Sequence, residues 1–466
     1  MINIQRNLFI ENILSEAKIN VNFDFSKIPY RDNIINYKNN KFSLIIFDID
    51  RIKNINFLKQ DIKSIKNNCS YSIFIPLSKS KKKIDNLIIY TEKLNLSNLI
   101  IVNCYKLGIK NLIDLKREKI FKTYLTIETQ LTLGKLITNI ITLLENKDIR
   151  LLSIDLDDTC WTGVIGEDGL KKIFLDNYQK KSLHYVNKLI TKTGLIVSIH
   201  SKNNKKIAVT GIKKKLVKYT NIIKKTFKYI NWDSKIKSIK KITKIVNFSK
   251  SNIIYFDDSI SEIKQINKFL LNKNCFWIKN SYFFYLYSKS FYLSNQNKEK
   301  NKNRFKDIKS NIARSEIADN KGVLNYIKTS NLKVQFSIKK LNLKRCVEMS
   351  NKTNQFNSNY QRYSLKNFKS FFNKKEIKIV TFSASDKYSD SGIIANIILK
   401  KNKYYDEINE FTMSCRALGR GLEFHFLHEL IKKFSINDLR INYIKTSRNE
   451  PFINLAEKIC LKKSKK

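Results

Sequence analysis

Glycine and proline are scarce in this chain of 466 residues, which contains 11 Gly and 3 Pro. Acidic residues are also few: 40 Asp and Glu stand against 89 Lys and Arg, which gives a formal net charge of +49. Such a charge is typical of proteins that bind nucleic acids or acidic membranes. Lys, Asn and Ile are abundant along the whole sequence, however, as an AT-rich coding sequence would produce. We therefore predict no nucleic-acid partner, while an acidic protein partner stays compatible with the charge.

Three further absences exclude classes of protein. The seven cysteines form no C-x-x-C pair and have no histidine at metal-ligand spacing, which argues against a disulfide framework or a zinc site and favours a reducing cytoplasm. No window reaches eighteen apolar residues, so no membrane span is predicted. The first twenty residues carry acids among apolar residues and do not resemble a signal peptide.

The length predicts several domains, because one core rarely serves so long a chain. Short apolar runs at 43–49, 72–77 and 98–103 alternate with helical patterns, which is typical of βαβ units and a parallel sheet. A helical pattern over 127–148 leads into the next domain. The predicted division is an N-terminal α/β domain (1–145), a central α/β domain (146–293), a polar connecting helix or flexible linker (294–330) and a third unit (331–466).

The segment Leu151–Gly169, LLSIDLDDTCWTGVIGEDG, concentrates the candidate chemistry. Its first residues are mainly apolar and predict a buried strand that ends at Asp155 and Asp157, followed by Asp158 and Thr159. Buried parallel strands carry carboxylates at their carboxyl ends, where ligands of open α/β folds collect. Two acids there suit a hard cation such as Mg²⁺ beside a phosphate. The alternative is a strand that ends in a polar turn.

Two more predicted strands deliver polar side chains to the same kind of edge. The run 195–203 places Ser201 at a strand end, and the run 252–259 places Asp257 and Asp258 at another. Between them, Lys235 begins a basic helix. Taken singly, Lys235 could be a surface lysine, and Asp257 and Asp258 could form a helix N-cap.

Together these residues match the parts that aspartate-based phosphoryl transfer requires. One acid attacks phosphorus, a second transfers protons, further acids complete a metal site, and a hydroxyl and an ammonium bind phosphate oxygens. The predicted roles are nucleophile for Asp155, acid/base for Asp157, phosphate binding for Ser201 and Lys235, and Mg²⁺ ligation for Asp155, Asp157, Asp257 and Asp258.

The segments DLDDTCWTGVIGEDG, IHSKN, INWDSK and YFDDSISE resemble those of FkbH-like proteins, a branch of the haloacid dehalogenase superfamily. The stretch from Trp161 to Gly169 separates this branch from other phosphatases of the superfamily. The resemblance implies an α/β fold with a central haloacid-dehalogenase-like (Rossmannoid) parallel sheet. It also implies a flanking N-terminal α/β domain and a C-terminal GNAT-like α+β domain.

The resemblance also implies a function. Such proteins dephosphorylate 1,3-bisphosphoglycerate and load its glyceryl group onto an acyl carrier protein as a thioester for polyketide biosynthesis. Mg²⁺ and the phosphopantetheine arm of the carrier would take part, and a basic enzyme suits an acidic carrier. The alternatives are a phosphatase of the same superfamily acting on another small substrate, and an inactive module that docks a carrier protein.

The second segment departs from the family pattern. Family members commonly have Cys before its Ser, a candidate for holding the acyl group as a thioester, whereas this chain has His200. His200 and Cys160 are the candidate acyl carriers here. The alternative for Cys160 is a small buried residue.

In the third unit, Arg416, Gly419 and Gly421 match the R-x-x-G-x-G turn of GNAT-like domains. Glycines in such a turn let backbone N–H groups approach a pyrophosphate at a helix start, so the turn is a candidate pantetheine or CoA site. Ala456 stands where acetyltransferases usually have Tyr. We therefore predict a domain that grips the pantetheine arm or an acyl group without acetyl transfer. The alternative is a truncated or decayed domain.

Overall fold

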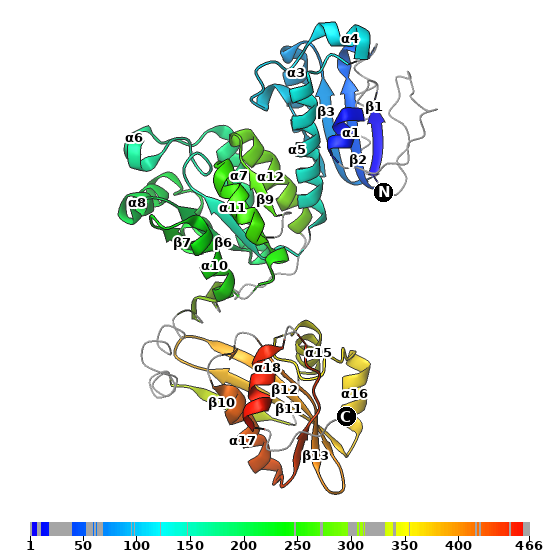
Figure 1. The fold of residues 1–466 in the computed structure, drawn as a ribbon, viewed down its shortest axis with the longest axis vertical. Helices are drawn as coiled ribbons and strands as arrows, with labels where there is room; N and C mark the ends of the chain where they lie inside the picture. Colours follow the sequence, from blue (N-terminus) through cyan, green and yellow to red (C-terminus); the bar gives the residue numbers. More distant parts are fainter. Residues whose placement is uncertain are drawn as a thin grey trace. The chain divides into compact units, whose positions relative to one another are not determined.

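The computed structural model divides the chain into two compact units, Met1–Lys244 with Phe248–Lys302, and Ile245–Asn247 with Asn303–Lys466. Parallel and mixed sheets with covering helices confirm the predicted α/β fold class (Figure 1). Within the described ranges, every helix is too short or too polar to cross a bilayer. These ranges are 2–6, 11–17, 40–52, 59, 62, 69–94, 96, 98–121, 123–146, 148–246, 248–270, 274–296, 305–306, 308–310, 312, 331–338, 342–353, 355–414, 417–418, 421–446 and 449–459.

The first sheet has four parallel strands in the order β1-β2-β3-β4. The apolar runs predicted as strands lie in it, and Leu44, Ile45 and Ile46 are buried in succession because both faces of the sheet are covered. Its strands are β1 Ile2–Arg6, β2 Asn40–Asp48, β3 Cys69–Leu77 and β4 Leu99–Ile101, and its helices are α1 Glu11–Glu16, α3 Lys81–Lys93, α4 Leu115–Phe121 and α5 Ile127–Glu145.

The second sheet has five parallel strands in the order β7-β6-β5-β8-β9. All residues of the central strand β5 (Leu151–Asp155) are buried, as its apolar sequence predicts. The other strands are β6 Ile196–Ser201, β7 Thr226–Ile230, β8 Ile253–Asp257 and β9 Cys275–Trp277, and the helices are α6 Ile165–Lys172, α7 Asn177–Thr193, α8 Lys205–Lys215, α9 Thr220–Lys224, α10 Lys235–Val246, α11 Ile260–Leu270 and α12 Ser281–Asn295.

The first two sheets share one continuous core. Helix α12 packs on α5 and α7, and its Tyr282 hydroxyl accepts from the Asn103 N–H (2.7 Å) and donates to the Ile101 carbonyl (3.2 Å) beside β4. The first sheet lies within the predicted domain 1–145 and the second within the predicted domain 146–293, and both belong to one compact unit. The exact boundaries stay predictions, and most of the predicted linker 294–330 lies outside the described residues.

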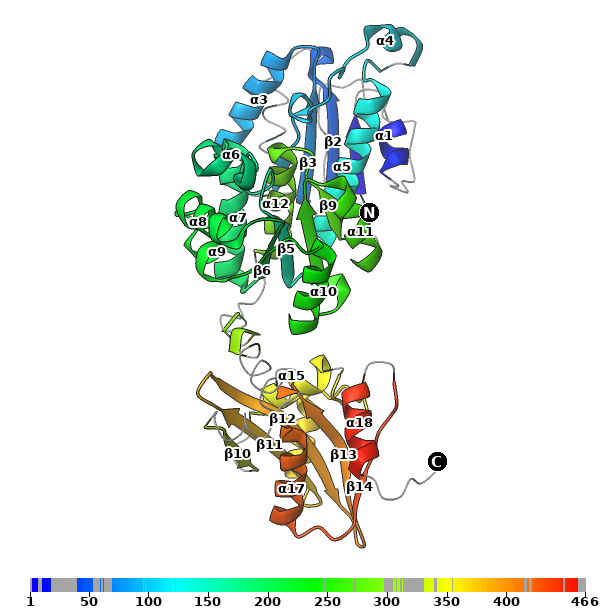
Figure 2. The ribbon, with the colours of Figure 1, turned by 60° about the vertical axis from the view of Figure 1, so that its left-hand side comes forward.

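The third sheet has the strand order β10-β11-β12-β13-β14, with β14 parallel to β13 and the other pairs antiparallel. Helices α17 and α18 cover one face (Figure 2), and α15 and α16 pack on the other. The strands are β10 Lys333–Ser337, β11 Ile377–Ser385, β12 Asp390–Lys401, β13 Asp406–Met413 and β14 Leu439–Ile441, and the helices are α15 Leu343–Lys352, α16 Leu365–Asn373, α17 Leu422–Phe434 and α18 Glu450–Ile459.

Candidate active site

The carboxyl edge of the second sheet carries the predicted site. Asp155 is the last residue of β5, Ser201 the last of β6 and Asp257 the last of β8. Because these strands are adjacent and parallel, their ends meet at one edge. Lys235 begins α10, which follows the neighbouring strand β7, so the chain order predicted from sequence does bring these side chains together.

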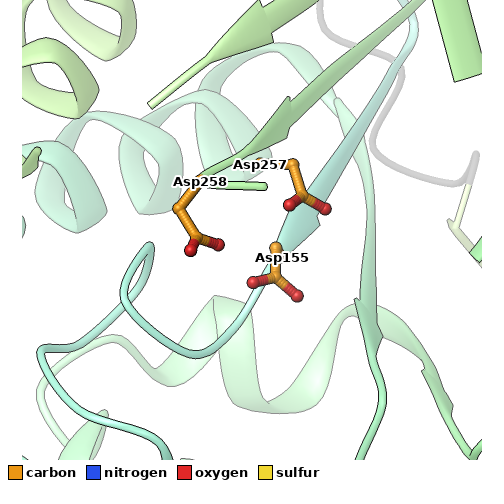
Figure 3. Close-up of side chains that lie close together, drawn as sticks. All are labelled: Asp155, Asp257 and Asp258. Carbon is orange, nitrogen blue, oxygen red and sulfur yellow. The ribbon is translucent and has the colours of Figure 1, made fainter. Parts of the chain in front are cut away.

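Three carboxyl groups gather at this edge. Ligand oxygens of Asp155, Asp257 and Asp258 all lie within 4.8 Å of one another (Figure 3). The Lys235 Nζ atom lies 2.7 Å from Asp155 Oδ1 and 2.7 Å from Asp257 Oδ2. Tyr255 also donates its hydroxyl hydrogen to Asp257 Oδ2. The cluster is therefore a compact, nearly enclosed set of acids held around one ammonium.

Burial and mutual repulsion shape the ionisation of the cluster. Burial, reinforced by the Asp257 carboxylate, raises the pKa of Asp155 well above its ordinary value, although Lys235 opposes this shift. Burial and Asp257 likewise raise the pKa of Asp258. Burial alone would lower the pKa of Lys235, but the carboxylates of Asp155 and Asp257 outweigh it and raise that pKa. Lys235 therefore stays protonated, but its single positive charge does not offset the burial and the mutual repulsion of the acids.

The donor set fits a hard divalent cation. When ionised, the three carboxylates carry three negative charges and Lys235 one positive charge, so the cluster has a formal charge of −2. Carboxylate oxygens are the ligands that Mg²⁺ prefers. Asp155, Asp257 and Asp258 are therefore the residues that would hold Mg²⁺.

Asp157 lies outside this group of three, although the sequence pattern assigned it to the same metal site. Its Oδ1 atom accepts hydrogen bonds from Trp161 Nε1 (2.9 Å) and the Ile165 N–H (3.1 Å), and its Oδ2 accepts from Asn203 Nδ2 (2.5 Å). The backbone turns sharply next to it, because Asp158 has a φ of 48°. Asp157 is thereby directed toward the segment after β5.

The segment after Asp157 forms a small flap with α6. Thr162 and Phe174 pair as an antiparallel bridge at its base. Gly163 has a φ of 97°, and a Cβ atom there would lie 3.0 Å from Asp168 Oδ2, so the position favours glycine. The Trp161 side chain is fully buried beneath the flap. The segment Trp161–Gly169, on which the sequence resemblance rests, therefore builds the surroundings of Asp157.

Ser201 is buried at the end of β6, and its Oγ atom accepts a hydrogen bond from Asn203 Nδ2 (2.8 Å). Because the amide nitrogen can only donate, the hydroxyl hydrogen of Ser201 is left for another acceptor. A phosphate oxygen is such an acceptor. Phosphate binding by Ser201 and Lys235 stays a prediction.

Cys160 and His200, the candidate acyl carriers, are both buried. The Cys160 thiol donates to the Asp155 carbonyl (3.1 Å), and burial together with the Asp155 and Asp157 carboxylates raises its pKa well above the ordinary value. His200 stacks on Tyr229 with ring centroids 5.3 Å apart. Burial and the charge of Lys235 lower the pKa of His200 to about 3. Both side chains are thus neutral and packed, which favours the alternative that Cys160 is a small buried residue.

The predicted pantetheine turn is described only in part. Arg416 and Gly419 lie outside the described residues. Gly421 has a φ of 69° and stands at the N-cap of α17, where a left-handed backbone favours glycine. Ala456 is buried in α18. Pantetheine or CoA binding at this turn stays a prediction.

Sequence patterns did not single out Asn203, Tyr255 or Trp277. Asn203 and Tyr255 contact predicted site residues, and Trp277 Nε1 donates to the Asp258 carbonyl (2.7 Å). Tyr255 lies two residues before Asp257 and so faces the same side of β8, a periodicity that could have identified it. Asn203 lies in the segment IHSKN, but no periodicity indicates its contacts, because they depend on how the flap packs on β6.

Comparisons with known proteins give structural neighbours alone. No family model matches the chain, and no curated protein matches it. One neighbour is the N-terminal part of a Bacteroides fragilis protein, which contains a phosphatase domain and is complexed with Mg. It is 15% identical, with a TM-score of 0.35, and the match covers 64% of this chain and 93% of that one. A second neighbour is a Vibrio cholerae protein that carries the name of a 3-deoxy-D-manno-octulosonate 8-phosphate phosphatase. It is 15% identical, with a TM-score of 0.25, and the match covers 33% of this chain and 90% of that one. A third neighbour is the Escherichia coli ribosomal-protein-S18-alanine N-acetyltransferase. It is 16% identical, with a TM-score of 0.22, and the match covers 27% of this chain and 76% of that one.

Proposed function

We propose that the chain is a Mg²⁺-dependent phosphatase that uses Asp155 as its nucleophile. The observation that carries this proposal is the position of Asp155. Its carboxylate ends the central strand, contacts the Lys235 ammonium and lies against Asp257 and Asp258. A nucleophilic carboxylate beside a fixed cation and a divalent-cation site is the arrangement that phosphoryl transfer requires.

The reaction follows from the roles of the side chains. An Asp155 oxygen forms a bond to phosphorus while the bond from phosphorus to the leaving oxygen breaks. The electron pair of that bond stays on the leaving oxygen, which takes a proton from Asp157. Water then attacks phosphorus and gives a proton to Asp157, and the Asp155 carboxylate departs. The products are the dephosphorylated compound and inorganic phosphate.

Positive charge near the phosphate comes from two sources. Lys235 neutralises charge that develops on phosphate oxygens, and the Ser201 hydroxyl donates a hydrogen bond to one of them. Mg²⁺, when bound by Asp155, Asp257 and Asp258, supplies charge neutralisation of the phosphate beside the nucleophile.

The finer proposal is that the substrate is 1,3-bisphosphoglycerate and that the glyceryl group passes to the phosphopantetheine thiol of an acyl carrier protein for polyketide biosynthesis. The resemblance of the Trp161–Gly169 segment to FkbH-like proteins supports it. The thiol sulfur bonds to the acyl carbon, and the phosphate on that carbon leaves with the electron pair of the C–O bond and takes the thiol proton. The 3-phosphate is hydrolysed at Asp155.

Burial of Cys160 and His200 favours direct attack by the carrier thiol over an enzyme-bound acyl group. Neither side chain is exposed, and the high pKa of Cys160 keeps its thiol protonated. The C-terminal unit would then grip the pantetheine arm near Gly421.

The test uses the full chain with Mg²⁺, 1,3-bisphosphoglycerate and a phosphopantetheinylated carrier protein. Phosphate release and the intact mass of the carrier are measured. A glyceryl adduct supports the finer proposal, and phosphate release without an adduct supports a phosphatase with another substrate. If neither the adduct nor phosphate forms, an inactive module that docks a carrier protein is the better hypothesis. In the matched variant Asp155→Asn, phosphate release should fall by about 10³-fold or more.

A further inference from the structure

Asn203 joins two residues that the proposed reaction uses for different purposes. Its Nδ2 atom lies 2.5 Å from Asp157 Oδ2 and 2.8 Å from Ser201 Oγ. One amide nitrogen carries two hydrogens, so a single group can make both bonds. Asn203 is 2% exposed, and the carboxylate and the hydroxyl it contacts come from different strand ends.

The flap holds Asn203 and Asp157 in a defined arrangement. Trp161 Nε1 and the Ile165 N–H both donate to Asp157 Oδ1, which leaves Oδ2 to Asn203. Gly166 allows a close approach, because a Cβ atom there would lie 3.1 Å from Asn203 Oδ1. The amide therefore has little freedom to rotate, and its nitrogen stays directed at the two oxygens.

We propose that Asn203 is a positioning residue that orients Asp157 for proton transfer and Ser201 for phosphate binding. This inference rests on the proposed function. By donating to Ser201 Oγ, the amide leaves the hydroxyl hydrogen to a phosphate oxygen. By donating to Asp157 Oδ2, it fixes the carboxyl group whose proton the leaving oxygen takes.

The two contacts predict different kinetic effects. Loss of the Asp157 contact slows substrates whose leaving oxygen needs a proton, such as 3-phosphoglycerate, and has little effect on 2,4-dinitrophenyl phosphate, whose leaving group is stable as an anion. Loss of the Ser201 contact weakens phosphate binding and raises KM for both. A purely structural role would lower both activities together.

The experiment compares Asn203→Asp and Asn203→Ser with the wild-type chain on these two substrates with Mg²⁺. Asn203→Asp keeps the shape of the side chain but places a carboxylate against Asp157. Asn203→Ser keeps one hydrogen-bond donor and adds no charge, so it serves if the buried charge of the first variant prevents folding. The control is Asn204→Ala, which removes the α8 N-cap contacts of the neighbouring residue and leaves those of Asn203 in place. Thermal unfolding of each variant identifies any that fail to fold.

Asn203→Asp should lower kcat for 3-phosphoglycerate by about 10²-fold more than for 2,4-dinitrophenyl phosphate, and raise KM for both. Asn203→Ser should show the same pattern to a smaller extent. Unchanged kinetics, or equal losses of kcat on both substrates, would overturn the inference while leaving the proposed function intact. Wild-type protein that releases no phosphate would overturn the proposed function, and the inference with it.

Discussion

The Lys235 ammonium lies 2.7 Å from Asp155 Oδ1, and both side chains are almost completely buried. The same Nζ atom lies 2.7 Å from Asp257 Oδ2, so one cation bridges the ends of β5 and β8. These carboxylates overcome the effect of burial and raise the pKa of Lys235. The ammonium is therefore both a phosphate-binding candidate and the partner of a buried carboxylate pair.

Replacement of Lys235 by Met should destabilise the protein. Removing one partner of a buried ion pair leaves uncompensated charge and typically costs about 3–5 kcal/mol. The measurement is urea denaturation at neutral pH without divalent cations. Lys237→Met, an exposed position two residues further along α10, is the control. Equal stability of the two variants would contradict the role given to Lys235.

Replacement of Asp155 by Asn in the Lys235→Met background should restore part of the lost stability. The amide carries no charge, so it does not need the ammonium as a partner. The double-mutant cycle measures the coupling of the two side chains directly. Additive effects of the two substitutions would show that the 2.7 Å contact contributes nothing to stability.

Cys160→Ala should leave phosphate release and carrier loading within about twofold of wild type, while lowering stability by about 1 kcal/mol. The thiol is buried and donates to the Asp155 carbonyl, so its loss affects packing more than chemistry. Intact-mass measurement of the carrier tests the loading. Cys346→Ala, a buried cysteine of the other unit, is the control. Loss of the adduct in Cys160→Ala alone would identify Cys160 as an acyl carrier.

Glu410 in β13 should make stability depend on pH. Burial raises its pKa from 4.5 to about 8, against the opposing Ser350 hydrogen bond and the charge of Arg362. Between these two values the folded protein binds more protons than the unfolded chain, so stability falls as the pH rises through this window. Below pH 4.5 both states are protonated at this group, and the effect vanishes.

Glu410→Gln should remove this dependence, because the amide resembles the neutral acid. Relative to wild type, the variant should gain stability between pH 5 and pH 8, by an amount on the order of a few kcal/mol. Urea denaturation at the two pH values measures the change. Glu407→Gln, on the same strand, is the control. A difference between Glu410→Gln and wild type that does not change with pH would refute the predicted protonation.

Most of the second sheet and the acid cluster could be predicted from the sequence. β5, β6 and β8 have continuous apolar runs because they are buried on both faces, and their polar ends mark the ligand edge. β7 (Thr226–Ile230) gave no such signal, because it lies at the sheet edge and its middle residues are half-buried. β9 has three residues, too few for a pattern.

The orientation of Asp157 could not be predicted. Its spacing from Asp155 places both acids near one site, but the positive φ of Asp158 and the donors Trp161 and Asn203 turn its carboxyl group toward the flap. Such contacts depend on tertiary packing. Sequence spacing therefore predicted which residues gather at this edge more completely than how their side chains are arranged.

The proposed reaction requires Asp155 to become phosphorylated during turnover. Borohydride reduces an aspartyl phosphate to homoserine, so the full chain is mixed with Mg²⁺ and acetyl phosphate, quenched with borohydride and mapped by peptide mass spectrometry. If Asp155 is the nucleophile, homoserine appears at position 155 in the wild-type chain and is absent from that position in Asp155→Asn. Steady phosphate release by the wild-type chain with unmodified Asp155 would contradict it.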